Sequence, residues 1–145
     1  MDEQQTRGFL QPETWADAEA RYEALGPTAQ TMVREVARAM SFDREEYDER
    51  VTPAVVETAR QTLFAEQLTV RVADRETFNV WREESTYDVR RAGSDNVDRV
   101  AWHVSPAAEA ATAATFQNEP DAAVGTVRRM AFNRLYRDRL TGDEQ

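Results

Sequence analysis

Apolar residues at helical spacing run through the first third of the chain. A first helix is predicted to begin behind Thr14, which together with Asp17 resembles a capping box. Its apolar positions share one face and are Trp15, Ala18, Tyr22 and Leu25. Gly26-Pro27 is predicted to end this helix and to begin a second one. The second helix has an apolar stripe formed by Met32, Val33, Val36, Ala37 and Met40.

Two further helical segments follow. Residues 43–50 are dense in charge and begin with Asp43 and Glu46 in capping positions, so a short exposed helix is expected. Thr52-Pro53 then opens another helix. Its apolar positions on one side are Val55, Ala59 and Leu63.

The pattern then changes from helical spacing to alternation, which is typical of half-buried strands. Strands are predicted around three groups of apolar residues: Leu68, Val70 and Val72; Tyr87 and Val89; and Val100, Trp102 and Val104. Between the first two groups, Asp74 is predicted to cap a short helix that carries Phe78 and Trp81.

Residues 107–117 fit two structures. Their alanines favour a helix, whereas Thr112, Thr115 and Phe116 favour a strand. We predict a strand at about 110–117, as an antiparallel neighbour of residues 98–104. Asn118 with Asp121 is predicted to cap a long final helix that reaches about Leu140.

This order of elements favours an α+β fold. We expect N-terminal helices, a mostly antiparallel sheet of three to four strands with an inserted short helix, helices on one face of the sheet, and a long C-terminal helix. Residues 1–145 are expected to form a single domain, with a helical part at about 12–67 and the sheet plus C-terminal helix at about 68–140. Residues 1–11 are expected to be a loose lead-in.

The composition narrows the classes of function. The 145 residues include no cysteine, which excludes disulfides, thiolate catalysis and cysteine-based metal centres. No apolar run approaches the roughly 18 to 20 residues that cross a bilayer. The polar segment Met1 to Arg7 is not followed by the apolar core of a signal peptide. A soluble cytoplasmic protein without membrane contact is therefore expected.

The charged residues suggest an unusual solvent. All 18 basic residues are arginine, and 27 acidic residues bring the net charge to −9. In molar salt the Debye length falls to roughly 3 Å, so an acidic surface repels itself little. Arginine also binds carboxylates through two parallel hydrogen bonds, which lysine cannot do. The composition favours a salt-adapted organism, and drift in a GC-rich genome is the alternative. In a salt-adapted protein the net charge says little about partners.

Several segments resemble one small protein family. They read YEALGPTAQ at residues 22–30, FDREEY at 42–47, NVDRVAWH at 96–103, AATFQ at 113–117 and RRMAF at 128–132. In these segments the chain resembles uncharacterised proteins of extremely halophilic archaea, and the resemblance covers nearly the whole chain. It implies salt adaptation, and it implies no particular activity or site residue.

His103 is the one histidine and the only candidate for catalysis. Imidazole titrates near neutrality, so it could act as a general base. The competing interpretation is a strand residue on the face opposite Trp102, hydrogen-bonded or solvated. One histidine without cysteine makes no familiar zinc site, and phosphate-binding glycine motifs are absent from the sequence. No metal or cofactor is predicted, and the chain is expected not to be an enzyme.

The last helix has an excess of positive charge. Residues 127–140 hold five arginines against Asp138 alone. The arginines could complement the helix dipole and pair with acidic neighbours. They could bind an acidic protein or a second copy of the chain, with Tyr136 and Phe132 as anchors. They could contact RNA or DNA, although molar salt weakens phosphate contacts. The predicted binding residues are Arg128, Arg129, Arg134, Tyr136 and Arg137.

These observations favour a non-catalytic protein-binding or regulatory module, acting on a partner protein or as a homo-oligomer. A nucleic-acid or ribonucleoprotein accessory factor that uses the arginine-rich helix is one alternative. A small-molecule enzyme that uses His103 is the other.

Overall fold

The alternating segments pair into one mixed sheet. The computed structural model describes residues 4–94 and 96–142, and within them the sheet has five strands: β1 (Gln5–Arg7), β2 (Val70–Asp74), β3 (Asp88–Ala92), β4 (Arg99–Ser105) and β5 (Ala110–Phe116). Their order across the sheet is β1-β2-β4-β5-β3. β3 runs parallel to β5, whereas the other neighbouring pairs are antiparallel. The α+β class is confirmed, but the expectation of three to four mostly antiparallel strands missed β1 and the parallel pairing of β3.

The alanine-rich segment after β4 is the predicted strand. β5 pairs antiparallel with β4, with Ala113 opposite Trp102 and Thr112 opposite His103. Ala113 packs in the same cluster as the Trp102 indole. In this position a small side chain leaves room for a large neighbour, and tertiary packing overrides the helix preference of alanine.

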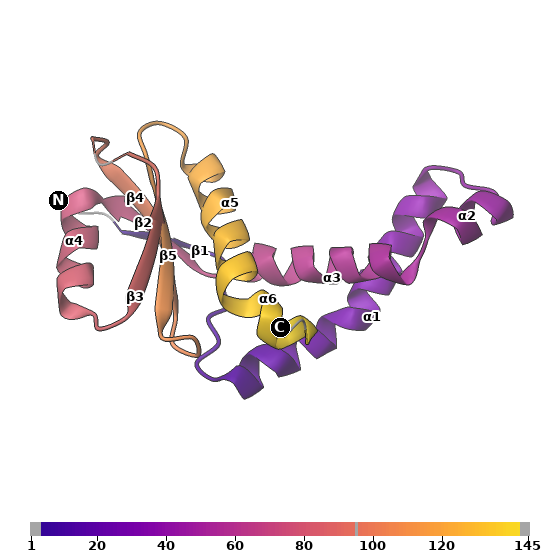
Figure 1. Cartoon of the computed structure of the whole chain (residues 1–145). Coiled ribbons are helices and arrows are strands. Elements are labelled where there is room, and N and C mark those ends of the chain that lie inside the picture. The colour runs from indigo at the N-terminus through magenta and orange to yellow at the C-terminus, as the bar shows by residue number, and fades with distance from the viewer. Residues whose placement is uncertain (1–3, 95, 143–145) are drawn as a thin grey trace.

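Helices cover both faces of the sheet rather than the one face expected (Figure 1). On one face lies α4 (Arg75–Glu84), whose Phe78 ring centroid is 5.1 Å from that of Trp102. On the other lies α5 (Pro120–Ala131), whose Val124 and Val127 pack with apolar residues of β2, β4 and β5. Asp74 caps α4 as predicted, because its carboxylate accepts a 2.8 Å hydrogen bond from the Thr77 N–H.

The C-terminal helix spans 22 residues but is not regular. After α5 the chain makes one π-helical turn, η1 (Phe132–Tyr136), and continues as α6 (Arg137–Thr141). The helix begins at Pro120, and its N-cap residue Glu119 makes no side-chain capping bond. The predicted cap at Asn118 is therefore wrong.

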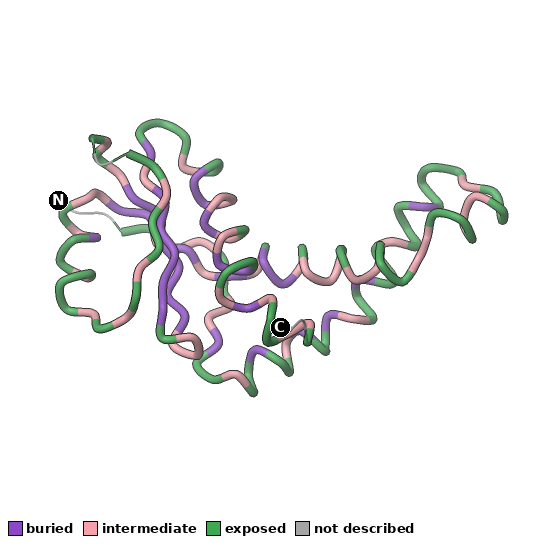
Figure 2. Tube along the Cα trace, in the orientation of Figure 1, coloured by how far each residue is buried: buried purple, intermediate pink, exposed green. Residues whose placement is uncertain are grey.

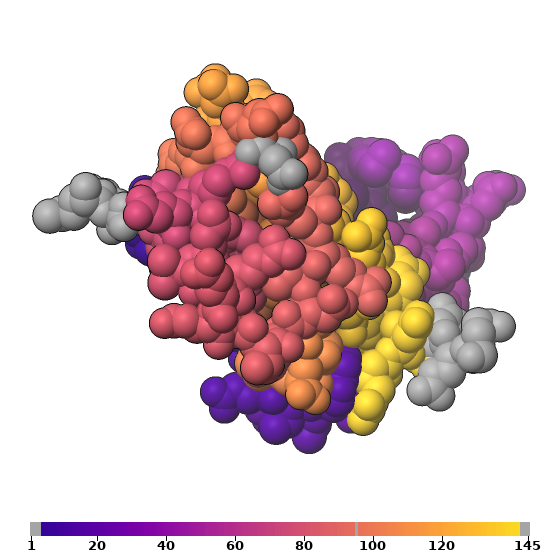
Figure 3. Space-filling view, turned by 60° about the vertical axis from the view of Figure 1, so that its left-hand side comes forward, coloured from indigo at the N-terminus to yellow at the C-terminus, as the bar shows by residue number. Residues whose placement is uncertain are grey.

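The N-terminal helices form an arm that projects from the sheet (Figure 1 and, in a turned view, Figure 3). α1 (Trp15–Ala39) runs outward, α2 (Arg44–Arg50) lies at the far end, and α3 (Pro53–Gln67) returns to the sheet. The predicted cap of α2 is present as a reciprocal pair of hydrogen bonds between Asp43 and Glu46. Figure 2 shows buried residues concentrated in the sheet, in α5 and at the base of the arm, whereas the outer half is largely exposed.

The sequence predicted that Gly26-Pro27 ends one helix and begins another, but α1 continues through both residues. Proline has no N–H, so residue 27 cannot donate the usual helical hydrogen bond to the carbonyl of Glu23, four residues earlier. Arg60 of α3 supplies the replacement by donating a 3.3 Å hydrogen bond to that carbonyl and a 2.8 Å hydrogen bond to the carbonyl of Tyr22. A side chain from another helix thus keeps α1 continuous across the proline.

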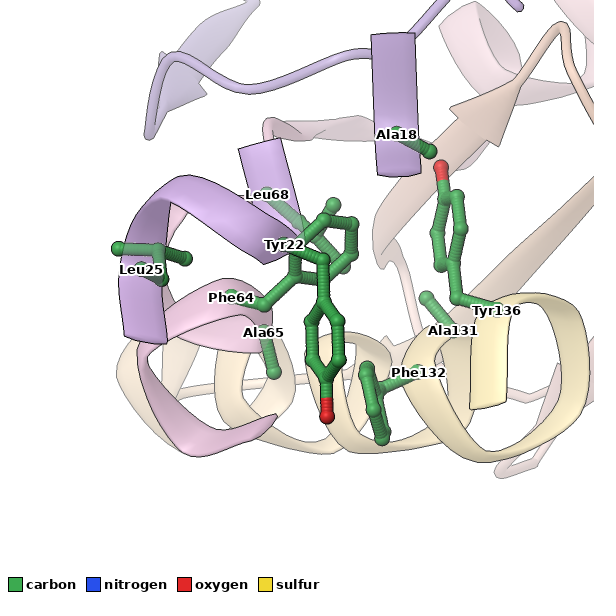
Figure 4. Packing of buried hydrophobic residues seen from close by; sticks show 9 residues of the cluster. All are labelled: Ala18, Tyr22, Leu25, Phe64, Ala65, Leu68, Ala131, Phe132 and Tyr136. Atoms are coloured by element: carbon green, nitrogen blue, oxygen red, sulfur yellow. The ribbon is translucent and has the colours of Figure 1, made fainter. Parts of the chain in front are cut away.

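An aromatic cluster joins the arm to the C-terminal helix. Figure 4 shows its nine buried members, contributed by α1, by α3 with Leu68, by α5 and by η1. The Phe64 ring lies 5.9 Å from Tyr22, 5.9 Å from Phe132 and 5.3 Å from Tyr136, measured between ring centroids. Because edge-to-face aromatic pairs stabilise packing beyond their buried area, this cluster fixes the base of the arm on the body.

Candidate functional site

His103 lies on β4 and is fully buried. Its Nδ1 is 2.7 Å from the Thr69 carbonyl oxygen, and its Nε2 is 2.8 Å from the Tyr136 hydroxyl. A carbonyl only accepts, so Nδ1 carries the proton and Nε2 accepts from the tyrosine. Burial lowers the pKa of His103 to about 4, so the imidazole is neutral at physiological pH.

The hydrogen-bond chain continues beyond Tyr136. Ser105 bonds to the tyrosine hydroxyl, and the Ser105 oxygen accepts a 3.2 Å hydrogen bond from the Ala108 N–H. Burial raises the pKa of Tyr136 to about 12. Both nitrogens of His103 are occupied by protein groups, so the geometry fits the structural interpretation of this histidine and leaves no nitrogen for a substrate.

Two residues singled out in the sequence are buried. His103 was the candidate general base, yet its side chain is enclosed between the sheet and the C-terminal helix. Tyr136 was a candidate anchor for a partner, but it is fully buried. Its hydroxyl donates a hydrogen bond to His103, and its ring packs against Phe64. Neither residue can contact a partner without local unfolding.

The arginines of the C-terminal helix separate into distinct environments. Arg128 is mostly buried, and its Nε donates a 3.0 Å hydrogen bond to the Leu68 carbonyl. Arg139 lies 3.5 Å from the Glu19 carboxylate and stacks over Trp15. Arg134 is exposed. Arg128, Arg129 and Arg137 line one groove, so the structure brings together three of the four predicted binding arginines.

This groove lies between α3 and the C-terminal helix and has a volume of about 370 Å³. We call it the arginine groove; it is lined by Thr58, Gln61, Thr62, Ala65, Glu66, Arg128, Arg129, Phe132, Asn133 and Arg137. Among these described lining residues Glu66 is the one carboxylate, and the Glu66 side chain is 65% exposed. The groove is therefore a locally positive recess on an acidic protein.

The arm carries a second candidate surface. Along α1 the residues Ala18, Tyr22, Leu25, Ala29, Met32 and Val36 recur at alternating intervals of four and three, with Met40 one turn further. The first four are at most 5% exposed, whereas Met32, Val36 and Met40 are 45%, 53% and 60% exposed. These three form what we call the arm stripe. One apolar seam thus begins in the core and ends in solvent.

A recess of about 570 Å³ lies where the end of β5 meets the start of α5. Among the described residues that line it, Glu119 is the one ionisable group, so they do not supply the paired groups of acid–base chemistry. Among residues 4–94 and 96–142, no group of three or more histidine or acidic side chains could hold a metal. No helix in this part of the chain is long and apolar enough to cross a membrane.

A family of proteins of unknown function, DUF5809, matches residues 9–137. The chain belongs to this family. The match covers the sheet from β2 onward, the whole arm and the groove-lining residues. Neither the curated proteins nor the solved structures contain a match to the chain. The family carries no assigned activity, so the functional conclusion depends on the two surfaces of the molecule.

The sequence pointed to the arginines of the C-terminal helix as candidates. It did not indicate the α3 residues that line the other side of the arginine groove, and it did not indicate that the arm stripe is exposed. The groove needs Thr58, Gln61 and Thr62, which lie some 70 residues from Arg129 in the chain and carry no motif. The arm stripe left one signal. Met32, Val36 and Met40 continue a seam that α3 is too short to cover, because α1 has 25 residues and α3 has 15.

Proposed function

We propose that the protein is a non-catalytic protein-binding module that docks an amphipathic helix of another protein on its arm. The observation that supports this proposal is the exposure of the arm stripe on the same seam that is buried at the base of α1. A seam with intervals of three and four is the pattern with which one helix packs along another.

The exposed seam favours association. Fully burying a valine or methionine side chain stabilises by roughly 1.5 to 3 kcal/mol. The residues of the arm stripe are each about half exposed, so a partner helix gains on the order of 1 kcal/mol from each. The opposite side of the same helix carries Arg34 and Arg38, so the helix has one apolar and one charged side.

The charge at the end of the arm selects the partner. Asp43 and α2 contain five acidic residues and two arginines. A partner helix that follows the arm stripe outward approaches this acidic end, and complementary charge speeds and orients docking. The proposed partner is therefore an amphipathic helix with apolar residues at three- and four-residue intervals and basic residues at the end nearer α2.

Site-specific photocrosslinking tests this proposal. A photoreactive amino acid at Val36 is expected to crosslink to a basic amphipathic segment of one other protein in cells. The same probe at Thr31, which is exposed on the opposite side of α1, is the matched control and should not. Val36→Glu in a chain that carries the probe at Met40 should abolish the crosslink.

Two results would reject the proposal. One is a crosslink at Val36 to the chain itself, accompanied by a dimer mass in light scattering, which would assign the arm stripe to homo-oligomerisation. The other is equal crosslinking from Thr31 and Val36.

We further infer that the protein works in the cytoplasm of a salt-adapted cell. The absence of lysine and cysteine from the sequence and the net charge of −9 support this inference. The salt dependence of stability, treated in the Discussion, provides its test.

A further inference from the structure

The arginine groove has two chemically different walls. The C-terminal helix contributes the guanidinium groups of Arg128, Arg129 and Arg137 together with the Asn133 amide. α3 contributes the neutral hydrogen-bonding side chains of Thr58, Gln61 and Thr62, and the carboxylate of Glu66 beside Arg128. Among the described lining residues, three positive groups are thus set against one carboxylate, and the recess of about 370 Å³ keeps an excess of positive charge.

Arg129 and Arg137 donate hydrogen bonds to uncharged side-chain oxygens. Arg137 places Nε and one terminal nitrogen 3.3 and 3.1 Å from the Asn133 side-chain oxygen. Arg129 is 3.4 Å from the Thr126 hydroxyl. These contacts orient the guanidinium groups without neutralising their charge. Arg128 differs, because Glu66 lies 3.8 Å from it and its Nε is bonded to a backbone carbonyl.

The irregular turn of the helix helps to place Arg137. In η1 the Arg137 N–H bonds to the Phe132 carbonyl five residues back. This wider turn sets residue 137 above residue 132, and the Arg137 guanidinium lies 5.6 Å from the centre of the Phe132 ring. Single π-helical turns frequently occur at functional sites. Here the turn supplies two groove residues, Asn133 and Phe132, and orients a third.

We propose that the arginine groove binds a small molecule that carries a phosphate or diphosphate group. Arginine binds such groups through two parallel hydrogen bonds. A planar carboxylate presents its acceptor lone pairs in one plane. A tetrahedral phosphate presents oxygens toward both walls, and so uses Arg129 and Arg137 on one side and Gln61 and the threonines on the other.

Isothermal titration calorimetry with inorganic diphosphate tests the proposal at 50 mM salt, where screening is modest. The full chain is expected to bind one equivalent. Arg137→Gln and Arg129→Gln should each weaken binding at least tenfold. Arg134→Gln is the matched control, because Arg134 is exposed on the same helix and does not line the groove. It should leave the dissociation constant within twofold of wild type.

Two further ligands separate the sources of negative charge. Citrate is expected to bind at least tenfold more weakly than diphosphate, because its carboxylates are planar. A single-stranded RNA of 20 nucleotides is expected to bind no more tightly than diphosphate. Tighter binding of RNA, weakened equally by Arg134→Gln and Arg137→Gln, would overturn the small-molecule assignment in favour of the nucleic-acid backbone.

Three other results would also overturn the proposal: no heat of binding with diphosphate, equal losses in all three arginine variants, or citrate binding as tightly as diphosphate. Circular dichroism melts show whether each variant is folded. Should Arg137→Gln fail to fold, Arg129→Gln decides the outcome, because Arg129 is exposed and its contact is a single long hydrogen bond. The groove is separate from the arm stripe, so its test stands apart from that of the docking proposal.

Discussion

At the scale of single residues, the series of hydrogen bonds that links Thr69, His103, Tyr136 and Ser105 determines how the core responds to pH. Every polar group in it has a partner. A buried, satisfied network of this kind stabilises one arrangement and penalises a change of protonation. Protonated His103 would place a second donor against the Tyr136 hydroxyl, which already donates to it.

We therefore expect acid to destabilise the protein through His103. Its pKa is about 4 in the folded state against 6.5 when unfolded, so the unfolded state binds more protons between these values. The stability is fully present above pH 6.5 and is lost as the pH falls toward 4, by roughly 3 kcal/mol in total. Urea unfolding at pH 7 and pH 4.5 measures this loss.

A His103→Gln variant separates this effect from that of the carboxylates, which titrate in the same range. The variant should be less stable at pH 7 but lose less stability between pH 6.5 and 4.5 than the wild type. Equal losses in the two proteins would show that His103 does not drive the acid response.

At the scale of elements, Arg60 and Pro27 should be energetically coupled. Arg60 donates to the carbonyls of Tyr22 and Glu23 and stacks over the Tyr22 ring at 4.5 Å. Removing a charged hydrogen-bond donor typically destabilises by about 1.5 to 3 kcal/mol. Arg60→Leu should therefore lower the free energy of unfolding by about 2 kcal/mol.

The coupling appears in the double variant. In Pro27→Ala the new N–H can bond to the Glu23 carbonyl, so that oxygen no longer depends on Arg60. Arg60→Leu should then cost about 1 kcal/mol less in the Pro27→Ala background than in the wild type. Chemical denaturation of the four proteins gives the coupling energy. Strict additivity would mean that Arg60 does not compensate for the proline.

The elements also show what local sequence could predict. The caps at Thr14, Asp43 and Asp74 were found because each side chain accepts a hydrogen bond from the N–H three residues later in the sequence. The strand at β5 was found from its own residues and its neighbour β4. These features are set by contacts close in the chain or by simple alternation.

What the sequence missed depends on distant partners. β3 pairs in parallel with β5, and β4 lies between these two strands in the sequence. The alternation of apolar and polar residues within a strand does not show which other strand it pairs with. The continuity of α1 depends on Arg60, which lies 33 residues beyond Pro27 in the chain. The groove and the arm stripe depend on where α3 ends relative to α1 and the C-terminal helix.

At the scale of the whole molecule, the charge is unevenly placed. Arginines gather in the groove at the base of the arm, whereas acidic residues dominate its far end. The net charge of −9 opposes compaction at low salt. Ion pairs offer little compensation where both groups are exposed, as in Arg38–Glu35, Arg90–Asp88 and Arg139–Glu19, because exposed pairs stabilise by at most about 1 kcal/mol each.

Salt should consequently stabilise the protein. Between 0.05 and 2 M KCl the Debye length falls severalfold, to about 3 Å or less, so the repulsion among carboxylates is screened while the core is not weakened. The melting temperature should rise steadily, each kcal/mol gained corresponding to about 2 to 4 °C.

The variant Asp48→Asn with Glu49→Gln tests whether repulsion is the cause of this salt dependence. Both side chains are exposed in the last turn of α2, where the helix dipole disfavours negative charge. Removing them changes the net charge from −9 to −7. The variant should melt at a higher temperature than the wild type at 0.05 M KCl and at the same temperature at 2 M. A wild-type melting temperature that falls as KCl increases would contradict both the repulsion argument and the inference of salt adaptation.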